Sequence, residues 1–270
     1  MSGPRARRML VSLLWLGVAG AGVARAQTAP TPLPDEMRLQ YIAACFGAVD
    51  RHDDDMNQAA TLCPCTLRAL ESVLTPSEYA ALVGAARAGA PPPPPPAALP
   101  RLEQDVQGCH QSAAVAAGAP LPASVQMAGM SVPLPAGFFA PETMGPGVGV
   151  EAVRAGGGLV LVQRRRAPVE HAFRASIVIL PTDGPPPVAE EDCKAFADQT
   201  PGVAQSVAVV RGASGPRCEV KKMAAEPPTR GATFAALGTS TRGWAVTCNY
   251  DVRDQASSQA CSDVLEGLKY

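Results

Sequence analysis

The chain has 270 residues and a formal net charge of −1 at pH 7, with 23 Lys and Arg against 24 Asp and Glu. Proteins that bind nucleic acid generally carry a strongly basic face, so this balance argues against a nucleic-acid partner. Ala, Gly, Pro and Arg are abundant whereas Lys is rare, which is typical of coding from a GC-rich bacterial genome.

Residues 1–26 have the pattern of a cleaved export signal. Arginines precede an uncharged apolar segment, residues 9–24, and Ala24-Arg25-Ala26 matches the small-x-small site of a signal peptidase. The apolar segment is short for a membrane span, and no later segment is long enough, so no transmembrane anchor is expected after cleavage. The pair Arg7-Arg8 leaves general secretion and twin-arginine export both open. The protein is therefore predicted to be periplasmic or secreted.

Export into an oxidising compartment makes disulfide bonds the expected state of the eight cysteines. The cysteines divide evenly between the two halves of the chain, which favours two bonds within each half. They are Cys45, Cys63, Cys65, Cys109, Cys193, Cys218, Cys248 and Cys261.

Residues 33–115 are predicted to form a small all-α domain of four helices. Pro34-Asp35-Glu36 opens the first helix, because proline suits the first turn and carboxylates oppose the N-terminal dipole. A second helix is expected from about Asp55 to Leu74, broken or kinked at Pro64, which lacks an N–H. The last helix carries Cys109.

A capping box, Thr75-Pro76-Ser77-Glu78, opens the third of these helices, which should end near Gly89. The six prolines at 91–96 cannot be helical and are expected to form a stiff polyproline spacer.

The acidic residues 50–55, before the second helix, resemble the start of an EF-hand loop. Gln58 and Pro64 stand where such a loop needs Gly and Glu, so a helix N-cap is the better interpretation.

Cys63-Pro64-Cys65 is the pattern in this half that could carry chemistry. Residues two apart on a helix point in nearly opposite directions, so Cys63 and Cys65 should bond to different neighbours. Hairpin register favours Cys45–Cys63 and Cys65–Cys109, and the swapped pairing stays open. The alternative is a thiol-redox or metal site at Cys63, Cys65, Cys109 and His110, since thiolates and imidazole suit copper(I) or zinc.

Residues 116–129 are rich in Ala, Gly and Pro and are predicted to be an interdomain linker. Residues 130–270 are predicted to form an α+β domain, an antiparallel sheet with an inserted helix near Cys193 and a closing helix at 254–268. Local spacing pairs Cys193 with Cys218 and Cys248 with Cys261. The strands are expected near 131–135, 148–153, 159–162, 173–180, 204–210, 218–223, 232–237 and 244–250.

Residues 130–270 resemble the PsbP-like α/β/α family. The resemblance rests on Val132-Pro133-Leu134-Pro135-Ala136-Gly137-Phe138 at the start of this region. It also rests on the last strand, Trp244–Tyr250, followed by the helix with Cys261-Ser262-Asp263-Val264-Leu265-Glu266-Gly267-Leu268. It covers about half of the chain. The resemblance implies binding or assembly rather than catalysis, and it transfers no functional residue.

The sequence contains no nucleophile elbow, Walker loop, dinucleotide fingerprint or HExxH helix. Arg164, Arg165 and Arg166, with Arg174 nearby, form the one basic cluster and are a candidate anion site. We therefore expect a non-catalytic exported accessory of the bacterial envelope that needs no cofactor and binds an envelope protein or a small ligand. The thiol or metal site is the alternative, and an enzyme built from unremarkable residues stays open.

Overall fold

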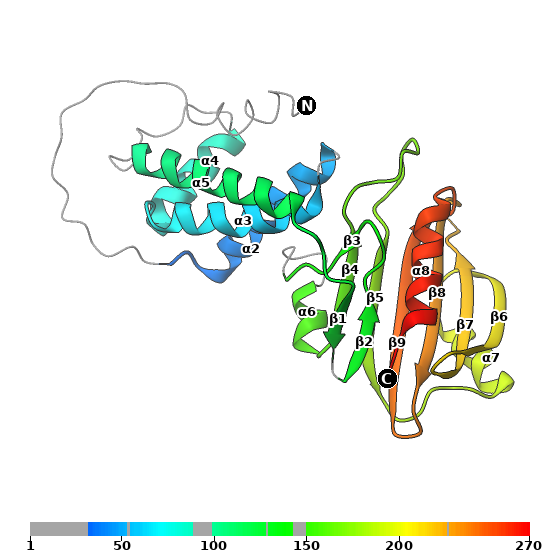
Figure 1. Cartoon of the computed structure of the whole chain (residues 1–270). Coiled ribbons are helices and arrows are strands. Elements are labelled where there is room, and N and C mark those ends of the chain that lie inside the picture. Colours follow the sequence, from blue (N-terminus) through cyan, green and yellow to red (C-terminus); the bar gives the residue numbers. More distant parts are fainter. Residues whose placement is uncertain (1–31, 53–54, 89–98, 128, 143–149, 226) are drawn as a thin grey trace, which may run out of the picture.

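The computed structural model describes residues 32–52, 55–88, 99–127, 129–142, 150–225 and 227–270. The predicted export signal and the polyproline spacer lie outside these residues and stay predictions. An N-terminal helical region is followed by an antiparallel sheet with associated helices, which confirms the predicted fold class (Figure 1). Within the described part of the chain, no helix combines the length and apolar character needed to cross a bilayer.

Among the described residues, the N-terminal region contains four helices. They are α2 (Asp35–Arg51), α3 (Met56–Glu71), α4 (Pro76–Ala88) and α5 (Leu99–Gly118). Helix α3 is central, because it packs against both α2 and α5.

Local capping fixes where two of these helices begin. The Asp55 carboxylate accepts a hydrogen bond from the Asn57 N–H at 2.9 Å, which confirms the predicted N-cap of α3. The capping box before α4 is also confirmed: the Thr75 N–H donates to the Glu78 carboxylate, and the Glu78 N–H donates to the Thr75 hydroxyl. Helix α3 continues through Pro64, so the helix is not broken there, and the kink stays a prediction.

The main sheet has seven antiparallel strands in the order β3-β4-β5-β9-β8-β7-β6, and β1 and β2 form a separate hairpin. These strands are labelled in Figure 1. Pro181, expected to end its strand, instead lies within β5 opposite Trp244 of β9. The strands are β1 (Ser124–Met127), β2 (Met130–Pro133), β3 (Phe138–Phe139), β4 (Leu159–Gln163), β5 (Ser176–Asp183), β6 (Val203–Gly212), β7 (Gly215–Met223), β8 (Arg230–Gly238) and β9 (Arg242–Asp251).

Two segments differ from the sequence-based expectation. The strand expected at 148–153 is wrong over its described part, which belongs to the short helix α6 (Val150–Ala155). A short apolar alternation does not separate strand from helix, and Val150 is fully buried in the packing between α6 and the sheet. The expected linker 116–129 is not irregular throughout, because α5 extends to Gly118 and β1 begins at Ser124.

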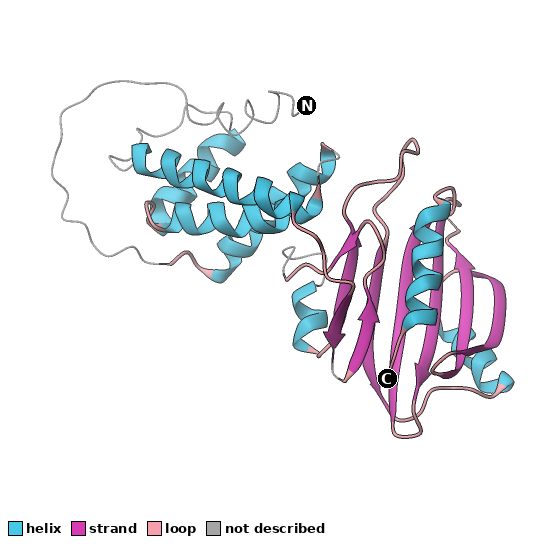
Figure 2. Ribbon diagram, viewed as in Figure 1, coloured by secondary structure: helices cyan, strands magenta, loops and turns pink. Residues whose placement is uncertain are grey.

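The sheet has a helical layer on each face. Alternate residues of β4 show the division: Leu159 and Leu161 pack under α8 (Gln255–Gly267) and the β1–β2 hairpin, which Figure 2 shows in front of the strands. Val160 and Val162 face the opposite way and share an apolar cluster with α2, α3 and α6. Helix α7 (Glu190–Gln199) covers β6 and β7.

The helical region and the sheet therefore share one apolar cluster. Phe46 of α2 and Met56 of α3 are nearly fully buried in it, and so are Phe139 of β3 and Val160 of β4. Burial of apolar surface is the main favourable term in folding. Because both regions contribute to the same cluster, each depends on the other for part of its stability.

Phe46→Ala should lower the free energy of unfolding by about 3–5 kcal/mol, because it empties a large buried volume in the shared cluster. Denaturant unfolding followed by circular dichroism measures this change. Leu39→Ala, at a side chain that is 38% exposed on the same helix, is the control and should have a small effect. Two separate transitions, of which only the first is shifted by Phe46→Ala, would contradict a shared core.

Candidate functional site

All eight cysteines lie in the described residues and all are paired, with no free thiol among them. The bonds include the first-half pairing that hairpin register favoured, and both pairs expected in the second half are confirmed. They are Cys45–Cys63, Cys65–Cys109, Cys193–Cys218 and Cys248–Cys261.

Helix α3 is joined covalently to both of its neighbours. Cys63 bonds to Cys45 of α2, and Cys65 bonds to Cys109 of α5. Two positions separate Cys63 from Cys65, so their side chains leave α3 on opposite sides, as helical geometry requires. The Cys-Pro-Cys pattern thus links three helices around one centre.

The cysteines of the alternative thiol or metal site are not available as thiolates when the disulfides are formed. Cys63, Cys65 and Cys109 are all in disulfides, and a metal requires the thiolate form. His110 follows Cys109 on α5 and is exposed. Over the described ranges, no three or more His, Cys, Asp or Glu side chains are grouped to hold a metal ion. Metal binding through these residues would first require reduction of both bonds.

The arginine cluster binds carboxylates of the protein itself, and its predicted role as an anion site stays a prediction. Arg164 forms two hydrogen bonds with Asp55, the shorter of 2.8 Å, and also donates to the carbonyl of Ala117. Arg166 and Arg174 both bind Asp50, at 2.6 and 2.7 Å. These ion pairs join the loops after β4 to the ends of α2 and α3.

Arg165 differs from the other members of the cluster. Its side chain is 75% exposed and its Nε lies 3.9 Å from the Asp55 carboxylate. The sequence contained both partners of this interface, the acidic residues 50–55 and the basic residues 164–166. Their opposite charges were the signal that could have joined them, but more than one hundred residues separate them along the chain.

Asp50 is held in its charged form. Burial by itself would raise the pKa of its carboxyl group, but the hydrogen bonds from Arg174 and then Arg166 outweigh burial and bring the pKa below its ordinary value. The side chain of Arg174 is only 7% exposed, so the pair is shielded from solvent on that side. The ion pairs thus fix the orientation of the helices on the sheet.

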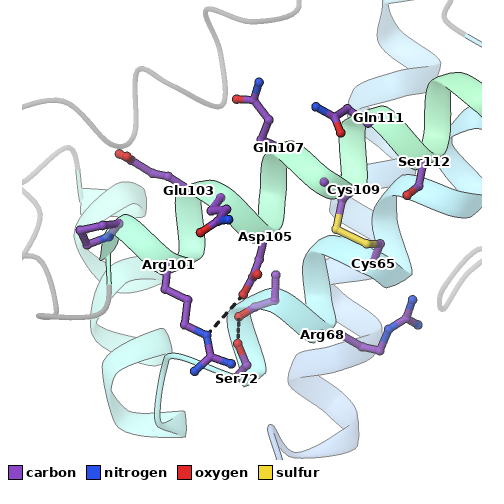
Figure 3. Close-up of a pocket in the computed structure, with 14 residues that line it drawn as sticks. Cys65, Arg68, Ser72, Arg101, Glu103, Asp105, Gln107, Cys109, Gln111 and Ser112 are labelled. Carbon is purple, nitrogen blue, oxygen red and sulfur yellow. Dashed lines mark hydrogen bonds and ion pairs between the residues drawn. A yellow bond between two sulfur atoms is a disulfide. The ribbon is translucent and has the colours of Figure 1, made fainter.

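A concave surface lies between α3 and α5, with a volume of about 920 Å³. The Cys65–Cys109 disulfide forms part of its wall (Figure 3). Arg101 and Asp105 form an ion pair of 3.8 Å along α5, and Arg68 lines the groove from α3. Most of the lining side chains are exposed, so the groove is an open, polar surface with charges of both signs.

Asp50→Asn should lower the free energy of unfolding by about 1–3 kcal/mol, because it leaves the nearly buried guanidinium of Arg174 without its carboxylate. Chemical denaturation at neutral pH measures the loss. Asp35→Asn is the control: this carboxylate is 92% exposed, it lies 3.6 Å from Arg38, and its replacement should cost less than about 0.5 kcal/mol. Equal effects of the two changes would show that the interface pairs do not contribute to stability.

The contribution of Asp50 should depend on pH with a defined sign. Because its pKa is lower in the folded protein than in the unfolded chain, its stabilising effect is complete above the unfolded value of about 4. The effect is lost as the pH falls through the lower folded value. The difference in stability between the wild type and Asp50→Asn should therefore be constant from pH 5 to 7 and shrink below pH 4. A difference that grows on acidification would reverse this assignment.

No protein-family model matches the chain, and no curated protein matches it. The resemblance of residues 130–270 to the PsbP-like family therefore stays a prediction. Among solved structures, a protein from Bacteroides thetaiotaomicron VPI-5482 is similar, with 13% identity and a TM-score of 0.34 over 52% of this chain. This chain covers only 44% of that protein.

A second similar structure is LpqN, described as involved in cell envelope biogenesis of Mycobacterium tuberculosis. It has 13% identity and a TM-score of 0.32, over 52% of this chain and 82% of LpqN. Both TM-scores are too low to support an argument about function.

Proposed function

We propose that the protein is an exported, non-catalytic binding or assembly protein of the bacterial envelope. The observation that carries this proposal is the pairing of all eight cysteines in four disulfides. Structural disulfides persist in oxidising compartments outside the cytoplasm and are rare within it. The export signal predicted at residues 1–26 is consistent with the same location.

The disulfides support a rigid scaffold that presents a surface. Two bonds join α3 to the helices on either side of it, and the groove between α3 and α5 lies over one of these bonds. A binding surface that is already ordered loses less conformational entropy when a partner binds. Covalent ties near the groove therefore suit a recognition role.

The chemistry of the groove indicates the kind of partner. Arg68, Arg101, Glu103 and Asp105 place charges of both signs along it, with exposed Gln side chains between them. Pockets for small apolar ligands are enclosed and mostly hydrophobic, whereas protein interfaces tolerate polar rims and water. A polar segment of an envelope protein fits this surface best. The predicted PsbP-like resemblance of residues 130–270 implies the same class of function.

The first test concerns the compartment and the thiols together. The full chain is produced in a bacterial host, cells are fractionated, and cysteines are alkylated before and after reduction. We expect the protein in the periplasmic fraction with a new N-terminus at Gln27, and alkylation only after reduction. Recovery from the cytosol with two or more reactive thiols would contradict the proposal and favour thiol exchange or metal binding through Cys63 and Cys65.

The second test asks whether the groove binds a partner. A photo-crosslinking amino acid is placed at Gln107, which lines the groove, and as a matched control at Ala195, an exposed position of α7. Irradiation of intact cells should give a covalent adduct with an envelope protein at Gln107 and not at Ala195. The same adduct at both positions, or none at Gln107, would remove the groove as the binding surface.

A further inference from the structure

A second cavity lies on the opposite side of the sheet region from the arginine interface, between α8 and strands β7, β8 and β9. Its volume is about 230 Å³, and it shares no lining residue with the groove between α3 and α5. This is smaller than the roughly 300–1,000 Å³ of pockets for drug-sized ligands. A ligand that fills it has about the size of a free amino acid.

The lining of this cavity is mostly polar. Gln255, Ser258, Gln259 and Ser262 recur at i, i+3, i+4 and i+7 and form one stripe on α8. Gln255 and Gln259 are exposed, whereas Ser258 and Ser262 are partly buried. The adjacent face of α8 buries Val264 in the core on this side of the sheet. The polar stripe therefore lies beside that core, where the cavity meets solvent.

Hydrogen bonding within α8 determines what the stripe offers a ligand. The hydroxyl of Ser258 donates to the carbonyl of Gln255, and that of Ser262 donates to the carbonyl of Ser258. The amide nitrogen of Gln259 donates to Asp263. Once these protons are engaged, the remaining hydrogen-bonding capacity of the two hydroxyls and of the Gln259 carbonyl is that of acceptors. The two serine hydroxyls thus suit a ligand that donates, and the amides of Gln255 and Gln259 can also donate to it.

The strand side supplies one carboxylate and one ammonium. Glu219 is bound by Arg217, with both side chains mostly buried and N–O distances of 2.6 Å, so its orientation is fixed. Lys221, two residues along β7, lines the same cavity and is exposed. Among the described residues, no carboxylate forms an ion pair with Lys221. Its ammonium can therefore take an anionic group of a ligand.

The two sides together select a ligand with charges of both signs. We propose that the cavity between α8 and β7–β9 binds a small zwitterion of the size and type of a free amino acid. The ammonium of the ligand donates to the acceptors of Ser258 and Ser262 and to Glu219, and its carboxylate pairs with Lys221. The hydroxyls of Thr233 and Tyr250, 3.1 Å apart, close the floor of the cavity and share one hydrogen bond.

Isothermal titration of the full exported chain tests the ligand class. The probes are glycine, L-serine and L-glutamine, with acetate and ethylamine as analogues that keep one charge, and glycerol as a neutral polyol. We expect at least one amino acid to bind. The analogues that keep one charge should bind with an affinity at least roughly tenfold lower than that of this amino acid. Glycerol binding as tightly as the amino acids, or no binding of any amino acid at millimolar concentration, would overturn the proposal.

Two variants locate the binding. Lys221→Met changes an exposed side chain and should weaken amino-acid binding roughly tenfold or more, because a charge-assisted hydrogen bond is lost. Lys194→Met, on exposed α7 over the other face, is its control and should leave binding unchanged. Ser262→Ala removes one acceptor while raising helix propensity, so a loss of affinity of roughly two- to tenfold would not reflect unfolding. Unchanged affinity in both Lys221→Met and Ser262→Ala would place the ligand elsewhere.

Discussion

The structure depends on the contact between the helical region and one face of the sheet. Apolar side chains of α2 and α3 pack with those of β3 and β4 in one cluster, and beside it Asp50 and Asp55 bind three arginines from the loops after β4. The apolar cluster stabilises this contact roughly in proportion to the apolar area that it removes from water. The ion pairs restrict the orientation of α2 and α3 relative to the sheet, because guanidinium and carboxylate groups bind in a defined geometry. Together they fix how the groove and the sheet are placed.

The disulfides join elements that are adjacent in the fold, whereas this interface joins the helical region to the sheet. Each of the four holds a helix to its immediate neighbour: α3 to α2 and to α5, α7 to β7, and α8 to β9. Buried polar contacts supplement two of them. Lys222 donates to the carbonyls of Ala197 and Thr200 at the C-terminal end of α7, where a cation is favoured, and Asp254 caps the first turn of α8. Helices α7 and α8 are thus each fixed at one end by polar contacts and joined to a strand by one covalent bond.

The two concave surfaces lie on elements that these ties hold rigid. The groove runs along α3 and α5 over Cys65–Cys109, and the cavity lies under α8, whose Cys261 is bonded to β9. Sites on helices and strands are positioned more accurately than sites on loops. The groove is open and charged, whereas the cavity is smaller, and the two share no lining residue.

The sequence by itself determined what depends on neighbouring residues: the fold class, the capping of α3 and α4, and the disulfide pairs of the second half. Short spacing sets these features, because a cap or a nearby disulfide involves few alternatives. The structure chose between the two pairings that the sequence left open in the first half. Only the tertiary structure decided that Arg164 binds Asp55, 109 residues away, and that Val150 belongs to a helix. It also carried α3 through Pro64 and placed the polar stripe of α8 over β7. These outcomes depend on which surfaces meet, and contact between distant segments leaves no periodic pattern in one sequence.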